Sequence, residues 1–205
     1  MGRKIGILGG TFNPIHNGHL ALGECALKQL DLDEIWFMPS GQTNLKKGLY
    51  ILPGSDRQAL ILLAIEGNKN FHFSDIELKR PGITYTYETL TELKKLYPEF
   101  EFYFILGADC LFSIEKWVEP SIIMSHAVLV SAVRGDADKI SLQKQAEYLE
   151  SKFNATIKLL DFPKEDISSS DIRARIANNE PIDHLVPANV AKYIRAHYCY
   201  QRMDQ

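Results

Sequence analysis

Two histidines three positions apart, His16 and His19, stand near the start of the chain, and small residues precede them: Gly9, Gly10 and Thr11. Residues 4–8 are an apolar run and residues 20–28 are periodic, so the order predicts a strand, a glycine turn and a helix. Glycine lets the backbone approach a ligand closely, and imidazole N–H groups donate to phosphoryl oxygens. Because helix N-termini favour phosphate, this segment predicts a phosphate-binding site.

The segment differs from two other phosphate-binding motifs and from a zinc site. It matches neither the G-x-G-x-x-G dinucleotide fingerprint nor the P-loop. Zinc is a competing interpretation, but two histidines fall short of the three or four ligands that zinc requires, and no nearby acid completes a set. We therefore expect no metal site built from protein ligands.

A second helix start lies near the C-terminus, at Ser168, Ser169 and Ser170, with Arg173 one turn later. Serine is a favoured N-cap, so the segment by itself indicates a capped surface helix. Together with the histidine segment it indicates a second set of hydroxyl and N–H groups for phosphate, with Arg173 adding charge.

Strand and helix patterns alternate along the whole chain, which predicts an α/β fold: a single doubly wound, mostly parallel Rossmann-like sheet with helices on both faces, in one domain spanning 1–205. The expected strands are 3–8, 34–38, 71–75, 101–106, 127–132 and 155–160. The expected helices are 18–30, 55–66, 85–97, 138–152, 169–178 and 187–197.

Two long stretches after strands, 39–54 and 107–121, are expected to be irregular. Long loops in compact domains are commonly lids or binding loops, and ligands bind at the carboxyl edge of such sheets. The second stretch carries Asp109 and Trp117, which suit a ribose and an aromatic ring respectively.

Composition describes an ordinary globular protein: 205 residues, 45% of them hydrophobic, 24% charged, with a net charge of −3. The charge argues against a broad nucleic-acid surface, and no apolar run reaches the roughly 20 residues of a membrane span. The three cysteines are widely spaced, and the N-terminus lacks the apolar core of a secretory signal, so we expect a cytoplasmic protein with reduced thiols.

The segment from Gly9 to His19 resembles the G-G-T-F-[DN]-P-x-H-x-G-H signature of nucleotidyltransferases that couple a nucleoside triphosphate to a phosphate-bearing acceptor. The whole chain resembles the bacterial nicotinate mononucleotide adenylyltransferase branch of that superfamily. Further matches are residues 77–90, residues 106–109 with Trp117 after them, and residues 167–173.

The resemblance implies transfer of AMP from ATP to nicotinate mononucleotide, giving deamido-NAD and pyrophosphate, with Mg²⁺ accompanying ATP. Catalysis is assigned to His16 and His19. ATP binding is assigned to Gly9, Gly10, Thr11, His16, His19, Lys46, Gly107, Asp109, Ile167, Ser168, Ser169 and Arg173, and acceptor binding to Thr84, Tyr85, Thr86, Trp117 and Arg134.

The chain departs from the family pattern at two places. Asn13 replaces the commoner aspartate, which removes one negative charge beside the phosphates. In the loop after the second strand, Leu45 stands where members usually carry a histidine, so only Lys46 remains of that motif. Two alternatives stay open: adenylyl transfer to nicotinamide mononucleotide or another phosphate acceptor, and a nucleotide sensor without turnover.

Overall fold

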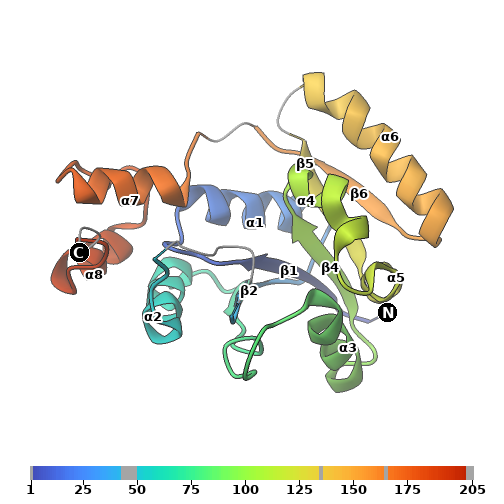
Figure 1. Cartoon of the computed structure of the whole chain (residues 1–205), viewed down its shortest axis with the longest axis horizontal. Coiled ribbons are helices and arrows are strands. Elements are labelled where there is room, and N and C mark those ends of the chain that lie inside the picture. The colour runs from blue at the N-terminus through green and yellow to red at the C-terminus, as the bar shows by residue number, and fades with distance from the viewer. Residues whose placement is uncertain (1, 43–49, 134–135, 164–165, 202–205) are drawn as a thin grey trace.

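Six parallel strands form one sheet in the computed structural model, which describes residues 2–42, 50–133, 136–163 and 166–201 (Figure 1). The strands are β1 (Lys4–Gly10), β2 (Glu34–Pro39), β3 (Phe71–Phe73), β4 (Glu101–Leu106), β5 (Val128–Val133) and β6 (Ile157–Asp161). Their order in the sheet is β3-β2-β1-β4-β5-β6. All six expected strands are confirmed, and so is the doubly wound α/β class.

The order of the strands reverses between β1 and β4, which are hydrogen-bonded neighbours with Ile7 opposite Phe104. In such sheets the ligand crevice lies outside the carboxyl ends of the strands at this reversal. The histidine segment follows β1, and Gly107 and Asp109 follow β4, at the N-cap and in the first turn of a helix over Ala108–Ser113. The topology therefore brings the two segments to one edge.

Nine helical segments lie between and after the strands in the described residues. The six expected helices are confirmed as α1 (Asn17–Gln29), α2 (Gly54–Ile65), α3 (Thr86–Leu96), α6 (Asp136–Phe153), α7 (Ser169–Ala177) and α8 (Ala188–Ala196). The expectation that residues 107–121 are irregular is wrong. They form α4 (Ala108–Ser113), the 3₁₀ helix η2 (Ile114–Lys116) and the start of α5 (Pro120–His126).

Side chains alternate between two hydrophobic clusters because successive residues of a strand point to opposite faces. In β4, Tyr103 and Ile105 join the cluster that contains α2, α7 and α8, whereas Phe102 and Leu106 join the cluster that contains α3 to α6. The sheet is thus covered on both faces, as near-continuous apolar strands require. No helix in the described part of the chain is long and apolar enough to cross a bilayer.

Candidate active site

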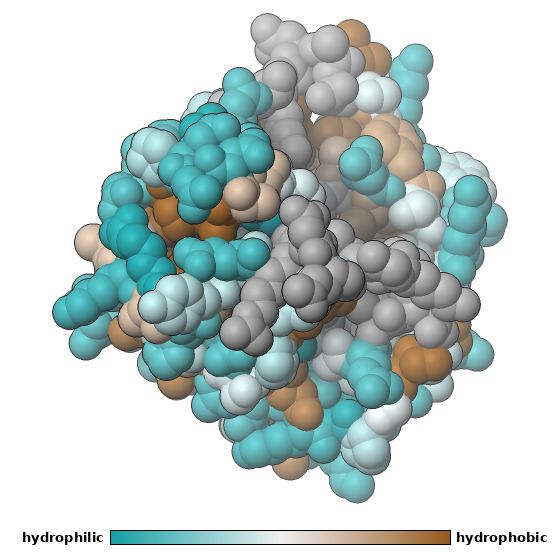
Figure 2. All heavy atoms as spheres, turned by 60° about the vertical axis from the view of Figure 1, so that its left-hand side comes forward, coloured by the Kyte–Doolittle hydropathy of each residue, from teal (hydrophilic) through white to brown (hydrophobic). Residues whose placement is uncertain are grey.

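A cavity of about 410 Å³ lies where β1 ends and where α1 and α7 begin. We call it the histidine cavity; its lining residues are Gly10, Thr11, Phe12, Asn13, His19, Ser169, Ser170 and Arg173. The two motifs that the sequence analysis paired, separated by about 150 positions, therefore meet in one cavity. The end of the molecule nearest α7 and α8 carries mainly hydrophilic residues on its surface (Figure 2).

His16 and His19 stack on each other with their ring centroids 3.7 Å apart, but only His19 lines the cavity. His16 is the N-cap of α1, and its backbone N–H donates to Nδ1 of His19 at 3.2 Å. A neutral His19 ring must therefore carry its proton on Nε2, because Nδ1 is occupied as an acceptor. His19 thus keeps Nε2–H as a donor.

His16 lies behind His19 and is only 7% exposed. Burial lowers its pKa from 6.5 to about 4, so the ring is neutral at physiological pH. Gly18 leaves room for it, since a Cβ at position 18 would lie 3.2 Å from His16 Nδ1 and 3.7 Å from Ile167 Cβ. Ile167, expected at the nucleotide site, thus lies against the first turn of α1.

Helix α7 is joined to the histidine segment by two hydrogen bonds. Ser169 Oγ donates to the Pro14 carbonyl at 2.9 Å, and Arg173 Nη1 donates to the Asn13 carbonyl at 2.8 Å. Ser168 is the N-cap, and its Oγ accepts from the Asp171 N–H at 3.0 Å. Arg173 is buried, so its charge is held beside the cavity by the packing of α7.

Asn13 is buried and hydrogen-bonded to three separate parts of the chain, and these contacts explain why an amide side chain fits this position. Its Nδ2 donates to the Tyr50 carbonyl at 2.8 Å, while its Oδ1 accepts from the Leu52 N–H at 3.1 Å and from the Tyr200 hydroxyl at 2.9 Å. A carboxylate has no donor for the Tyr50 carbonyl. The interpretation of Asn13 as the mere loss of a charge is therefore incomplete.

A second cavity, of about 290 Å³, brings together four of the five residues expected to bind the acceptor: Thr84, Tyr85, Thr86 and Trp117. We call it the tryptophan cavity. Its other lining residues are Ser40, Glu77, Ile83, Lys116, Val118 and Ile123. Trp117 packs edge-on against Phe104 at 6.5 Å and also lines the cavity, so it serves the core and the site together.

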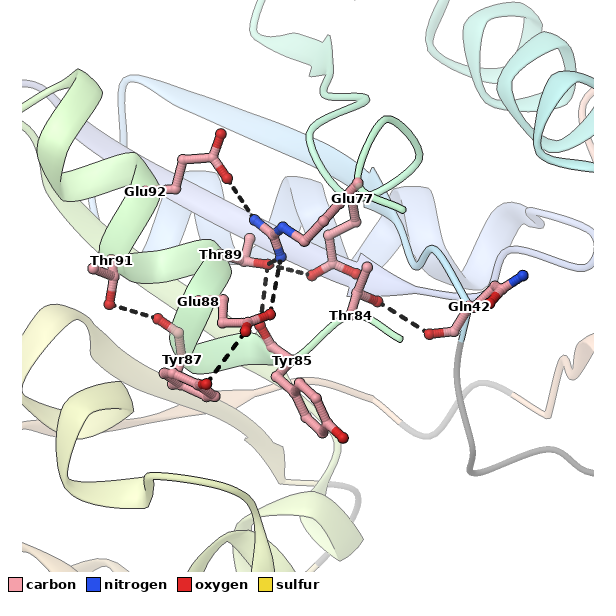
Figure 3. A network of polar contacts seen from close by, with 10 residues as sticks. Gln42, Glu77, Thr84, Tyr85, Tyr87, Glu88, Thr89, Thr91 and Glu92 are labelled. Atoms are coloured by element: carbon pink, nitrogen blue, oxygen red, sulfur yellow. Dashed lines mark hydrogen bonds and ion pairs between the residues drawn. The ribbon is translucent and has the colours of Figure 1, made fainter. Parts of the chain in front are cut away.

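Polar contacts hold the start of α3 at this cavity (Figure 3). Thr89 Oγ1 donates to Glu77 at 2.9 Å and accepts from Arg80 at 2.8 Å, and Arg80 also pairs with Glu92 at 2.6 Å. The Thr84 N–H donates to the Gln42 carbonyl at 3.0 Å. Gly41 permits this approach, because a Cβ there would lie 2.5 Å from the Glu77 carbonyl oxygen.

The remaining expected residues fall into three groups. Gly9 lies within β1 opposite Met38 and does not line the histidine cavity. Gly107 is the N-cap of α4, with open space at its Cβ position, and Asp109 is exposed in the first turn. Lys46, Leu45 and Arg134 lie outside the described residues.

Several residues at the site were missed by sequence reasoning. Phe12 lines the histidine cavity and adjoins expected residues, so the motif boundary was the available signal; Ser170, which belongs to the expected serine segment but was not assigned a role, lines it as well. Lys116 lines the tryptophan cavity beside Trp117. Arg57 and Tyr200 lie behind the cavities, and both are buried. No local pattern marks these two, since burial of an arginine depends on segments far away in sequence.

Arg173 gives the histidine cavity a positive charge that does not depend on protonation of the histidines. No carboxylate lines it within the described ranges, Arg173 supplies a guanidinium, and His16 is neutral. Among those same residues, no group of three or more His, Cys, Asp or Glu side chains is arranged to hold a metal ion. The arrangement suits an anionic ligand bound through N–H and hydroxyl donors.

Comparisons with known proteins agree with this geometry. The profile of the cytidylyltransferase-like family matches residues 7–175. A probable nicotinate-nucleotide adenylyltransferase of Lachnoclostridium phytofermentans is 43% identical over 97% of this chain and 99% of its own length. One from Dehalococcoides mccartyi is 44% identical over 97% and 98% respectively. The solved structure of Plasmodium falciparum nicotinic acid mononucleotide adenylyltransferase complexed with NaAD has a TM-score of 0.78, at 24% identity and 97% coverage of both chains, and shows likeness of fold.

Proposed function

We propose that this chain, which belongs to the cytidylyltransferase-like family and within it to the nicotinate-nucleotide adenylyltransferases, transfers AMP from ATP to nicotinate mononucleotide. The products are nicotinic acid adenine dinucleotide and pyrophosphate. The observation that carries the proposal is the meeting of His19, Ser169 and Arg173 in one cavity, in a chain with full-length relatives of that name.

The chemistry requires positioning and charge stabilisation rather than a base. An oxygen of the acceptor phosphate forms a bond to the α-phosphorus of ATP, and the bond from that phosphorus to the bridging oxygen of pyrophosphate breaks. The acceptor oxygen is already anionic at pH 7. Catalysis then depends on holding the reactants in line and on donors aimed at the charge that develops.

His19 and α7 supply those donors in our proposal. His19 Nε2–H donates to a phosphoryl oxygen, with the tautomer selected by the hydrogen bond at Nδ1. Arg173 and Ser169 bind the β- and γ-phosphates, supported by their place on the cavity wall. His16 supports His19 through the stacked rings. Gly10 and Thr11 add backbone and hydroxyl contacts, and Lys46 adds charge.

The adenosine side is assigned to the turn after β4 and to the residues before α7. Asp109 accepts hydrogen bonds from the ribose hydroxyls, and Gly107 leaves its backbone open to the nucleotide. Ile167 and Ser168 lie near the adenine, supported by the contact of Ile167 with the first turn of α1.

In our proposal the tryptophan cavity binds the acid rather than the amide, with the carboxylate of Glu77 on its wall held by Thr89 Oγ1. Thr84, Tyr85 and Thr86 lead into α3, whose N-terminal dipole favours a carboxylate, and Lys116 adds a positive charge at the same cavity. Trp117 offers a face for a pyridine ring. Arg134 is assigned to the acceptor phosphate.

We also infer that Mg²⁺ enters with ATP, held by substrate oxygens and water. Support comes from the lining of the histidine cavity, which has no carboxylate within the described ranges, whereas a protein-built magnesium site uses carboxylates. We infer a cytoplasmic enzyme acting on small molecules, with no nucleic-acid or membrane partner, supported by the three free cysteines and the net charge of −3.

The test is release of pyrophosphate with ATP and Mg²⁺ in the presence of nicotinate mononucleotide, nicotinamide mononucleotide or phosphopantetheine. We expect a strong preference for the nicotinate compound. Preference for another acceptor would overturn the assignment of the tryptophan cavity. Binding of ATP without release in any of the three reactions would favour a sensor instead.

A further inference from the structure

Arg57 lies behind both cavities and holds three separate segments of backbone. It belongs to α2 and is only 5% exposed. Its Nε donates to the Leu52 carbonyl at 3.1 Å, and its Nη1 donates to the carbonyls of Thr11 at 3.1 Å and Ser40 at 2.8 Å. One guanidinium therefore joins the segments after β1, after β2 and before α2.

The two carbonyls on Nη1 belong to the walls of different cavities. Thr11 lines the histidine cavity, and Ser40 lines the tryptophan cavity. The Ser40 N–H also donates to the Gly10 carbonyl at 2.8 Å, so the two walls are tied at neighbouring points. A single nitrogen atom of Arg57 thus spans the boundary between the two proposed substrate sites.

Arg57, like Arg173, is a buried arginine. Among the residues that the structure describes it makes no ion pair, although a buried charge without a counterion is costly. Arg80, which is less deeply buried, pairs with Glu92 and Glu88. A lone guanidinium on three carbonyls fits a role in fixing backbone geometry, since its planar fork holds several acceptors at set angles.

We propose that Arg57 is a positioning residue that fixes the histidine cavity relative to the tryptophan cavity, so that the acceptor phosphate meets the α-phosphorus of ATP in line. The inference rests on the proposed adenylyl transfer. Each substrate has its own binding groups, so Arg57 contributes chiefly to their mutual alignment. A misplacement of about 1 Å lowers a rate by roughly 100-fold.

The test compares wild type with Arg57→Met, Arg57→Lys and the control Arg195→Met. Arg195 pairs with Asp183 on the exposed side of α8, away from both cavities. For each protein we would measure kcat with both substrates saturating, the Kd of a non-hydrolysable ATP analogue alone, the Kd of nicotinate mononucleotide alone, and Tm. Assays are run at least 15 °C below the lowest Tm.

We expect Arg57→Met to lower kcat by about 100-fold while each Kd changes by less than about threefold. Arg57→Lys should recover part of kcat, because it keeps the charge but loses the fork. If Arg57→Met does not fold, the same split between kcat and Kd is required of Arg57→Lys. Arg195→Met should match wild type in kcat and in both Kd values.

Two failures are distinguishable. The positioning role is wrong, and the proposed function stands, if wild type turns over and the Arg57 variants keep kcat within threefold of the wild-type value. The same conclusion follows if their affinity for the substrates falls in proportion to kcat. If wild type releases no pyrophosphate with any acceptor, the proposed function fails and the role of Arg57 fails with it.

Discussion

At the scale of single residues, His19 and His16 are neighbours in different environments. His19 faces the histidine cavity, and its tautomer is set by a backbone N–H, whereas His16 is buried and neutral. A donor that acts in the transition state affects turnover more than binding.

We therefore expect His19→Ala to lower kcat by about 100- to 1,000-fold, while the KM for ATP changes by less than about threefold. Pyrophosphate release at varied ATP concentrations measures both constants. His184→Ala is the matched control, because His184 lies outside both cavities. Small and equal losses in kcat and in affinity for His19→Ala would contradict a role in the transition state.

The low pKa of His16 makes the stability of the fold depend on pH. The folded pKa is about 4 and the unfolded pKa is 6.5, so below pH 6.5 the unfolded chain binds more protons and stability falls as pH falls. Between pH 7.5 and pH 5, wild type should lose about 2 kcal/mol more free energy of unfolding than His16→Asn. Urea unfolding at the two pH values measures this, and parallel losses in both proteins would contradict it.

At the scale of elements, α7 places Arg173 and Ser169 on the wall of the histidine cavity, so the position of both side chains depends on the stability of the first turn of this helix. Ser168→Ala removes the side-chain cap on the Asp171 N–H and should lower the free energy of unfolding by about 1 kcal/mol. Urea denaturation measures it. Ser151→Ala, at an exposed position inside α6, is the control and should not destabilise the fold. Equal effects of the two substitutions would argue against the cap.

The strands and the long helices were predictable, and the short helices were not. The strands and the six helices of nine or more residues follow from apolar runs and helical periodicity. Helices α4 and α5 have six and seven residues, about two turns, and are too short to establish a period. Pro120 at the start of α5 was the local signal available, since proline is favoured in the first turn.

At the scale of the whole molecule, two residues far apart in the sequence meet at the wall of the histidine cavity, which Asn13 lines. The Tyr200 hydroxyl donates to Asn13 Oδ1 across 187 positions, and burial raises the pKa of Tyr200, which keeps the phenol protonated. Tyr200→Phe should lower the free energy of unfolding by about 1 kcal/mol. The control is Tyr198→Phe, at a side chain that is 69% exposed, with an expected change within about 0.5 kcal/mol. Urea unfolding that does not separate the two variants would contradict the role of this hydrogen bond.

Sequence motifs predicted part of the cavity walls, missed Phe12 and Lys116 on them, and missed the residues behind them. His19, Thr11, Ser169 and Arg173 were found because each belongs to a short, specific segment. Arg57 and Tyr200 contact carbonyl and amide groups that come from distant parts of the chain, so no local spacing encodes their roles. Such contacts follow from the topology of the sheet, which only the three-dimensional structure provides.

The hydrogen bond between Tyr200 and Asn13 also has a consequence for biosynthesis. A ribosome adds about 5–20 residues per second. The interval between synthesis of Asn13 and synthesis of its partner 187 positions later is therefore on the order of 10–40 s. Arg173 and Ser169 emerge only slightly earlier. A nascent chain therefore contains the residues of β1 and α1 long before it contains the residues of α7 that complete the wall of the histidine cavity.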